Sequence, residues 1–219
     1  MDVYATDEEK VEALKKWWKE NATTVITGVL LALAVLFGGR AWFQYRANQS
    51  QKASNEYAQL TTAVANKKDQ AALAAGEALT THYSSSPYAV LATFALAKLK
   101  IQQGELQAAQ VQLKWALDHA DQPQLKQIAR LRLARVMLAR KDYAGAEKVL
   151  SAGDPGNFKG EYAALRGDVA LAQGKVQQAR AAYDEALQAL PAGAPGRALL
   201  QAERDNAVKA DGPGKEPRS

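Results

Sequence analysis

Residues 160–191 read GEYAALRGDVALAQGKVQQARAAYDEALQALP, and small side chains recur along this stretch at regular intervals. Counted from Gly160 as position 1, the small residues at positions 8, 15, 20 and 27 are Gly167, Gly174, Ala179 and Ala186. Small residues let two helices approach closely, and glycine suits the turn between them. Tyr183 at position 24 can fill the gap to a next helix pair, and Pro191 ends the second helix because it lacks an amide hydrogen. The stretch therefore predicts two packed helices joined by a tight turn.

The same arrangement recurs before residue 160. Gly104, the pair Lys141-Asp142 and Gly174 interrupt the helical pattern at nearly equal spacings. Units that start near Val90 and Gln127 carry small or aliphatic residues at matching positions, namely Leu96, Ala97, Ala109, Leu113 and Ala116, then Leu133, Ala134, Ala146 and Leu150. The period of about 34 residues resembles that of tetratricopeptide repeats, whose helix pairs stack into a solenoid. A plain helical bundle is the alternative, which three consecutive units disfavour.

The two ends of the array match the pattern less closely. A unit near Glu56 keeps only some of the expected residues. Residues 196–210 are amphipathic, and we expect Leu199, Leu200 and Ala207 to lie on the last repeat as a cap. We assign 40–210 to the repeat domain and predict that residues 211–219 are disordered.

The composition supports an all-α protein without a catalytic centre. The 219 residues include no Cys and two His, so disulfides, thiol nucleophiles and the usual zinc sites are excluded. Asp118 and His119 are adjacent and so do not share a helix face, and the same holds for Asp184 and Glu185. We therefore predict no enzymatic activity, no metal and no cofactor. The net charge of +5 lacks the basic stripe of a nucleic-acid binder, so we expect no nucleic acid partner.

Residues 22–39 form an uncharged apolar stretch near the N-terminus. As a helix, 18 residues span about 27 Å, close to the roughly 30 Å of a bilayer core. Residues typical of membrane interfaces flank it on both sides, namely Trp17, Trp18, Arg40, Trp42 and Phe43. A buried core helix is the alternative, and a cleaved signal peptide is disfavoured by the acidic region ahead of it. We predict a single transmembrane anchor, and flanking basic residues favour a cytoplasmic N-terminus by only four to three.

The tail of residues 1–21 also has helical features. Thr6 and Glu9 form a capping-box pattern, and Val11, Leu14 and Trp18 fall on one helical face. We expect a short amphipathic helix from about Asp7 that leads into the membrane. Two interpretations of its apolar face stay open, contact with the lipid surface and contact with a partner.

The first helices of each pair are expected to line a concave face. Array positions 2, 5, 9, 12 and 13 usually point there, which gives a mixed groove suited to a protein segment. The predicted groove residues are Phe94, Lys98, Leu131, Arg135, Leu138 and Asp168. The alternative is that Phe94, Leu131 and Leu138 are simply core. A clamp for C-terminal carboxylates built from Lys and Asn is disfavoured, because the first helices of the last three units contain no Asn.

The order of these parts is similar to the bacterial YfgM family of ancillary subunits of the SecYEG translocon. The resemblance rests on KVEALKKWWKEN (10–21), GVLLALAVLFGG (28–39), LKQIARLRLARV (125–136) and LRGDVALAQGKVQQARAAYDEAL (165–187). With the connecting array it covers nearly the whole chain. The blocks LRLARV and LRGD are more specific than the repeat period.

The resemblance implies a single-pass, type II protein of the bacterial inner membrane, with a cytoplasmic N-terminus and periplasmic repeats. It implies the SecYEG translocon, a PpiD-like periplasmic chaperone and exported nascent proteins as partners. The implied function is a non-enzymatic adaptor that helps exported proteins reach chaperones, and no catalytic residues carry over. A regulator of envelope stress acting through the cytoplasmic tail and a structural scaffold are the alternatives.

Overall fold

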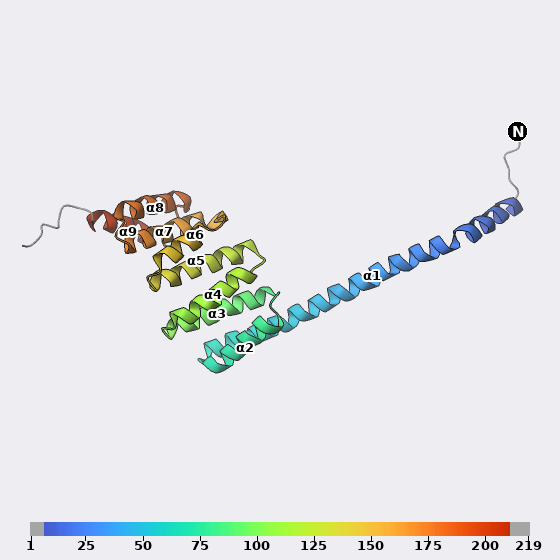
Figure 1. Cartoon of the computed structure of the whole chain (residues 1–219), viewed down its shortest axis with the longest axis horizontal. Helices are drawn as coiled ribbons and strands as arrows, with labels where there is room; N and C mark the ends of the chain where they lie inside the picture. The colour runs from blue at the N-terminus through green and yellow to red at the C-terminus, as the bar shows by residue number, and fades with distance from the viewer. Residues whose placement is uncertain (1–6, 211–219) are drawn as a thin grey trace, which may run out of the picture. The chain divides into compact units, whose positions relative to one another are not determined.

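The computed structural model describes residues 7–210 and is built from helices (Figure 1). The elements are α1 (Asp7–Ala65), α2 (Asp69–His82), α3 (Pro87–Gln102), α4 (Leu106–His119), α5 (Pro123–Ala139), α6 (Tyr143–Ser151), a 3-10 turn η1 (Gly156–Phe158), α7 (Lys159–Ala172), α8 (Val176–Ala189) and α9 (Arg197–Ala210). No strand occurs in this part of the chain, which confirms the all-α class. Thr6 of the capping box and residues 211–219 of the predicted disordered tail lie outside the described residues.

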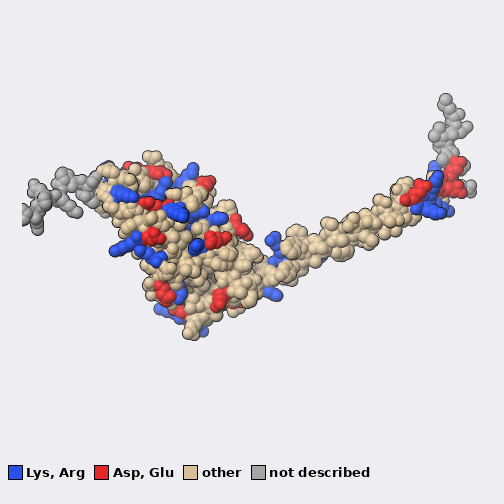
Figure 2. Space-filling view, in the orientation of Figure 1, with Lys and Arg blue, Asp and Glu red and all other residues tan. Residues whose placement is uncertain are grey.

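The chain divides into two compact units, Met1–Lys52 and Ala53–Ser219. In the first unit, α1 begins at Asp7 and runs through the predicted anchor without a break. It is the one described helix that is long and apolar enough to cross a membrane, and none of its apolar window is buried. A core helix of a soluble protein would be mostly buried. Figure 2 shows the uncharged stretch of α1, with charged side chains gathered at its N-terminal end.

The predicted interface residues of the anchor are exposed. Trp17 and Trp18 lie before the apolar window, and Trp42 and Phe43 lie after it. Near Trp42, the guanidinium of Arg46 stands 5.6 Å from the centre of the indole ring. Aromatic rings that combine apolar area with a neighbouring cation suit the headgroup layer of a bilayer.

The second unit is a stack of helix pairs, as the repeat period predicts. The end of α1 packs with α2, while α3 pairs with α4, α5 with α6 and α7 with α8, and α9 packs against α8. Each turn within a pair contains one residue in the left-handed region, namely Lys67 (φ 54°), Gly104 (φ 77°), Lys141 (φ 62°) and Gly174 (φ 75°). In each turn the next amide donates to the carbonyl five residues back, for example Glu105 N to Lys100 O at 2.8 Å. These are Schellman motifs, which reverse the chain within a few residues and satisfy the last carbonyls of the first helix.

Close packing within each pair occurs at the predicted small residues. Ala109, Ala146 and Ala179, which share array position 20, are fully buried. Tyr183 lies against Gly167 of its own pair, where any Cβ would collide with the ring. The aromatic residue at position 24 therefore fills space within its pair, and it also belongs to the buried cluster that includes α9.

The last helix caps the array with fewer residues than predicted. Leu200 and Ala207 are buried against the last pair. Leu199 is 64% exposed, so the prediction that it lies on the last repeat is wrong. Adjacent residues on a helix point about 100° apart, and α9 offers one narrow apolar face to α8.

Candidate partner-binding surface

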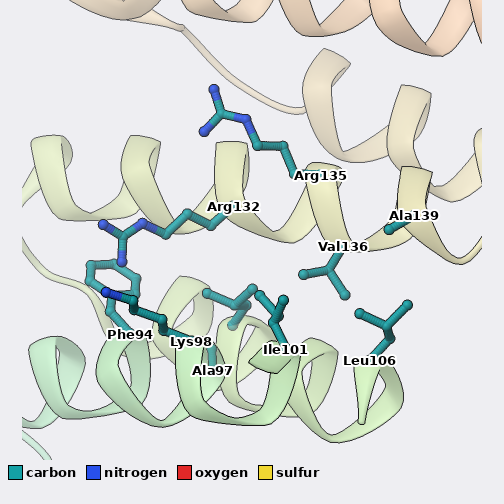
Figure 3. A pocket seen from close by; sticks show the side chains of 10 residues that line it. Phe94, Ala97, Lys98, Ile101, Leu106, Arg132, Arg135, Val136 and Ala139 are labelled. Atoms are coloured by element: carbon teal, nitrogen blue, oxygen red, sulfur yellow. The ribbon is translucent and has the colours of Figure 1, made fainter. Parts of the chain in front are cut away.

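A cavity of about 350 Å³ lies between α3, α4 and α5. Its walls are apolar and its rim is basic (Figure 3). The lining residues are Phe94, Ala97, Lys98, Ile101, Leu106, Leu113, Arg132, Arg135, Val136 and Ala139. We call this cavity the Phe94 pocket. Its volume lies at the lower end of the range of about 300–1,000 Å³ that is usual for ligand sites.

The side chains of Arg132 and Lys98 lie beside the ring of Phe94 at one side of the Phe94 pocket. The guanidinium of Arg132 stands 4.5 Å from the centre of the Phe94 ring, a cation–π arrangement. Figure 3 shows Lys98 beside this pair, while Arg135 extends from α5 in another direction. Desolvation, and then repulsion by Arg135, lower the pKa of Arg132. Among the described residues, no ion pair involves these three cations, so an anionic ligand would find them available.

The structure brings together three of the six predicted groove residues. Phe94, Lys98 and Arg135 line the Phe94 pocket. Leu131 is 4% exposed and Leu138 is partly buried, and both pack in a cluster with side chains of α6 and α7. For these two leucines the core interpretation holds, and the apolar walls of the cavity come from other residues.

Asp168, the sixth predicted residue, lies on α7 outside the Phe94 pocket. Its carboxylate accepts a hydrogen bond of 2.9 Å from the hydroxyl of Tyr183. Desolvation raises the pKa of Asp168, and the Tyr183 hydrogen bond and the charge of Arg135 partly offset that rise. Desolvation and the nearby Asp168 charge also raise the pKa of Glu203 on α9. The carboxylates of Asp168 and Glu203 therefore both have raised pKa values, and they lie close enough for the charge of Asp168 to act on Glu203.

Sequence reasoning missed Arg132 and Glu203. Arg132 occupies array position 6, which was not expected to face the groove, although it lies three residues before Arg135 and hence on the same helical face. Glu203 belongs to α9, for which the sequence pattern predicts only a capping role. Aligning α9 with the first helices of the repeats would have placed Glu203 at position 9, beside Asp168 in the series.

Members of the adjacent polar pairs 118–119 and 184–185, which do not form catalytic dyads, contact other groups. Asp184 and Glu185 pair with arginines on α9 and α7 respectively. The imidazole of His119 stacks on the ring of Trp115, with 4.0 Å between ring centres. Within the described part of the chain, no group of three or more His, Asp or Glu side chains could hold a metal ion.

Comparisons with known proteins agree with this architecture. The family described as tetratricopeptide repeat-like domain matches residues 15–209. A protein of Escherichia coli strain K12 named ancillary SecYEG translocon subunit is 31% identical over 184 residues, which cover 84% of this chain and 88% of that protein. Proteins with the same name from Haemophilus influenzae and Neisseria gonorrhoeae are 31% and 27% identical, over 83% and 94% of this chain and 89% and 99% of their own lengths. The chain therefore belongs to the YfgM-like family of ancillary SecYEG translocon subunits with a tetratricopeptide repeat-like domain.

Proposed function

We propose that this protein is a non-enzymatic adaptor that is tethered to the bacterial inner membrane and assists protein export at the SecYEG translocon. The name shared by its relatives supports the association with the translocon. The exposed apolar stretch of α1 supports the tether, because such a surface is stable only in a bilayer or against another protein. In this proposal the N-terminus is cytoplasmic and the repeats are periplasmic.

The task at the translocon is hand-over of exported segments to a periplasmic chaperone of the PpiD type. The observation that carries this part is the Phe94 pocket, which joins apolar walls to a basic rim. A protein segment that leaves a channel unfolded exposes apolar and charged side chains together. A concave face that offers both kinds of contact can hold such a segment until a chaperone takes it.

Site-specific photocrosslinking in growing cells tests the proposal. A photoreactive amino acid at Leu36, exposed in the apolar window, should crosslink to a translocon subunit. The same amino acid at Ile101 on the Phe94 pocket should crosslink to exported chains or to the chaperone. Val111, which is exposed on α4 but does not line the cavity, is the matched control.

The two crosslinking positions test separate parts of the proposal. Absence of translocon products from Leu36 would contradict the tether at SecYEG. Equal yields of exported chains from Ile101 and Val111 would show that the Phe94 pocket is not the binding surface. The double variant Lys98→Glu with Arg135→Glu should lower the yield from Ile101 while circular dichroism stays unchanged, since both cations border solvent.

A further inference from the structure

Four charged residues stand at equivalent places along the array. Lys98 on α3, Arg135 on α5 and Asp168 on α7 share array position 9 and follow one another at nearly equal spacings. Glu203 on α9 follows Asp168 at a similar spacing. We call these four residues the charge ladder. The helix α9 packs on the last pair as the first helix of a further unit would. The charge ladder therefore has two basic rungs, Lys98 and Arg135, followed by two acidic rungs, Asp168 and Glu203.

Successive members of the charge ladder lie near one another. Lys98 and Arg135 both line the Phe94 pocket. Arg135 acts electrostatically on Asp168, and Asp168 acts on Glu203. In addition, α5 contacts α7 directly, although α6 separates them in the sequence. Arg132 strengthens the basic half, because it lies on the same face as Arg135 and covers the ring of Phe94. The four residues therefore form a series from α3 to α9 that is basic at one end and acidic at the other.

The two halves of the charge ladder are suited to different chemical groups of a ligand. At the basic half, the Phe94 pocket accepts a large apolar side chain, and Lys98 with Arg132 favours a carboxylate next to it. At the acidic half, desolvation and then the charge of Asp168 raise the pKa of Glu203, and a bound cation would relieve the repulsion between the two carboxylates. Among the described residues, no Lys or Arg forms an ion pair with either carboxylate.

The distance between the two halves sets the spacing in the ligand. The centres of the two halves lie two rungs apart, and at about 8–10 Å per rung, the usual spacing of packed helices, this distance is about 16–20 Å. An extended chain advances about 3.3 Å per residue and covers this distance in about six residues. A helical segment would need about twice as many residues, since it rises only about 1.5 Å per residue.

We propose that the charge ladder and the Phe94 pocket bind an extended segment of an unfolded protein chain in one orientation. That segment carries an acidic residue beside a large apolar residue, and Lys or Arg about six residues away. This inference rests on the proposed function, because it names the class of segment that the Phe94 pocket receives. The acidic end of the bound segment lies over α3 and α5, and its basic end lies over α7 and α9.

Peptide binding to the purified full-length protein in detergent micelles tests the inference. Three fluorescent twelve-residue peptides share two leucines at fixed positions and differ only in charge. One has an acidic half and a basic half, one is acidic throughout and one is basic throughout. Fluorescence anisotropy should show that the mixed peptide binds about tenfold more tightly than either uniform peptide, since each uniform peptide meets one half of like charge.

Variants at the two ends of the charge ladder sharpen the test. Glu203→Lys should weaken binding of the mixed peptide several-fold and strengthen binding of the acidic peptide. Lys98→Glu should weaken binding of the mixed and acidic peptides alike. The matched controls are Asp118→Lys and Lys114→Glu, exposed positions on α4 that carry the same changes of charge without lining the cavity. These controls should leave all three affinities unchanged.

A third variant separates apolar contact from charge. Ile101→Ser should weaken all three peptides by a similar factor, because Ile101 lines the cavity and carries no charge. Equal affinities of the mixed and acidic peptides, or a Glu203→Lys variant that behaves like wild type, would overturn the inference. Because binding is measured on the purified protein, either outcome leaves the crosslinking of α1 to the translocon unaffected.

Discussion

At the scale of single residues, Gly167 shows how one missing methyl group sets the spacing of two helices. The ring of Tyr183 on α8 occupies the space where a Cβ at residue 167 on α7 would lie. Gly167→Ala should therefore displace the ring or separate the helices, and destabilise the protein by about 1–3 kcal/mol. Thermal unfolding followed by circular dichroism measures the loss. Gly193→Ala is the control and should change stability little, since no atom lies within 4 Å of a Cβ placed there.

The carboxyl group of Asp168 gives a prediction of pH dependence. Its pKa is raised above 3.8 in the folded protein, chiefly by desolvation, with Tyr183, Arg135 and Glu203 as the titratable neighbours. The folded state therefore holds the proton more tightly than the unfolded state, and this group destabilises the fold as the pH rises from 3.8 through its raised pKa. Asp168→Asn removes that contribution and keeps an acceptor for the Tyr183 hydroxyl.

The variant Asp168→Asn should thus gain thermal stability relative to wild type as the pH increases from about 4 towards 7. Unfolding temperatures of both proteins across this range test the prediction. A difference that is constant with pH, or that shrinks as the pH rises, would contradict the sign. The Asp168→Asn change leaves Arg135 and Glu203 in place. The difference in unfolding temperature between the two proteins is therefore due to the charge of residue 168 and to its effect on Glu203.

At the scale of elements, the turns within the helix pairs share one geometry but not one residue type. Lys141 stands in the left-handed region between α5 and α6, where Gly104 and Gly174 stand in the neighbouring pairs. A residue with a Cβ is strained by about 1–2 kcal/mol in this conformation, and glycine removes that strain. Glycine also loses more conformational entropy on folding, which offsets part of the gain in stability. Lys141→Gly should therefore stabilise the protein by up to about 1 kcal/mol.

Chemical denaturation of the Lys141→Gly variant measures this gain. Lys114→Gly makes the same change within α4 and should instead cost about 1 kcal/mol, because glycine is a poor helix former. If both variants lost stability, the left-handed conformation at residue 141 would not be the source of strain.

At the scale of the whole molecule, the proposed topology can be tested with single cysteines, because the chain contains none. Ser84→Cys, in the exposed turn between α2 and α3, should react with a membrane-impermeant maleimide in spheroplasts. Ala13→Cys, ahead of the apolar window, should react only after the membrane is broken. The opposite labelling pattern would place the repeats in the cytoplasm and rule out their proposed contact with exported chains.

The repeat fold and the long apolar helix α1 could be predicted from the sequence because both depend on local patterns. Small residues such as Ala179 recur where helices of a pair must approach closely, and that steric requirement imposes a nearly constant period along the array. Residues 22–39 carry no charge over a helix length close to the thickness of a bilayer core. This match in length depends on these residues alone and not on the rest of the chain.

Only the tertiary structure decided which side chains line the Phe94 pocket and which are buried between helix pairs. Leu131 and Arg132 are adjacent, yet the first is buried towards α7 and the second covers Phe94, because packing against the next pair sets the rotation of α5 about its axis. Likewise, α9 continues the series of first helices, which brings Glu203 close to Asp168. Periodicity specifies which residues recur, whereas the rotation and stacking of whole helices, set by contacts between distant segments, determine which surface they form.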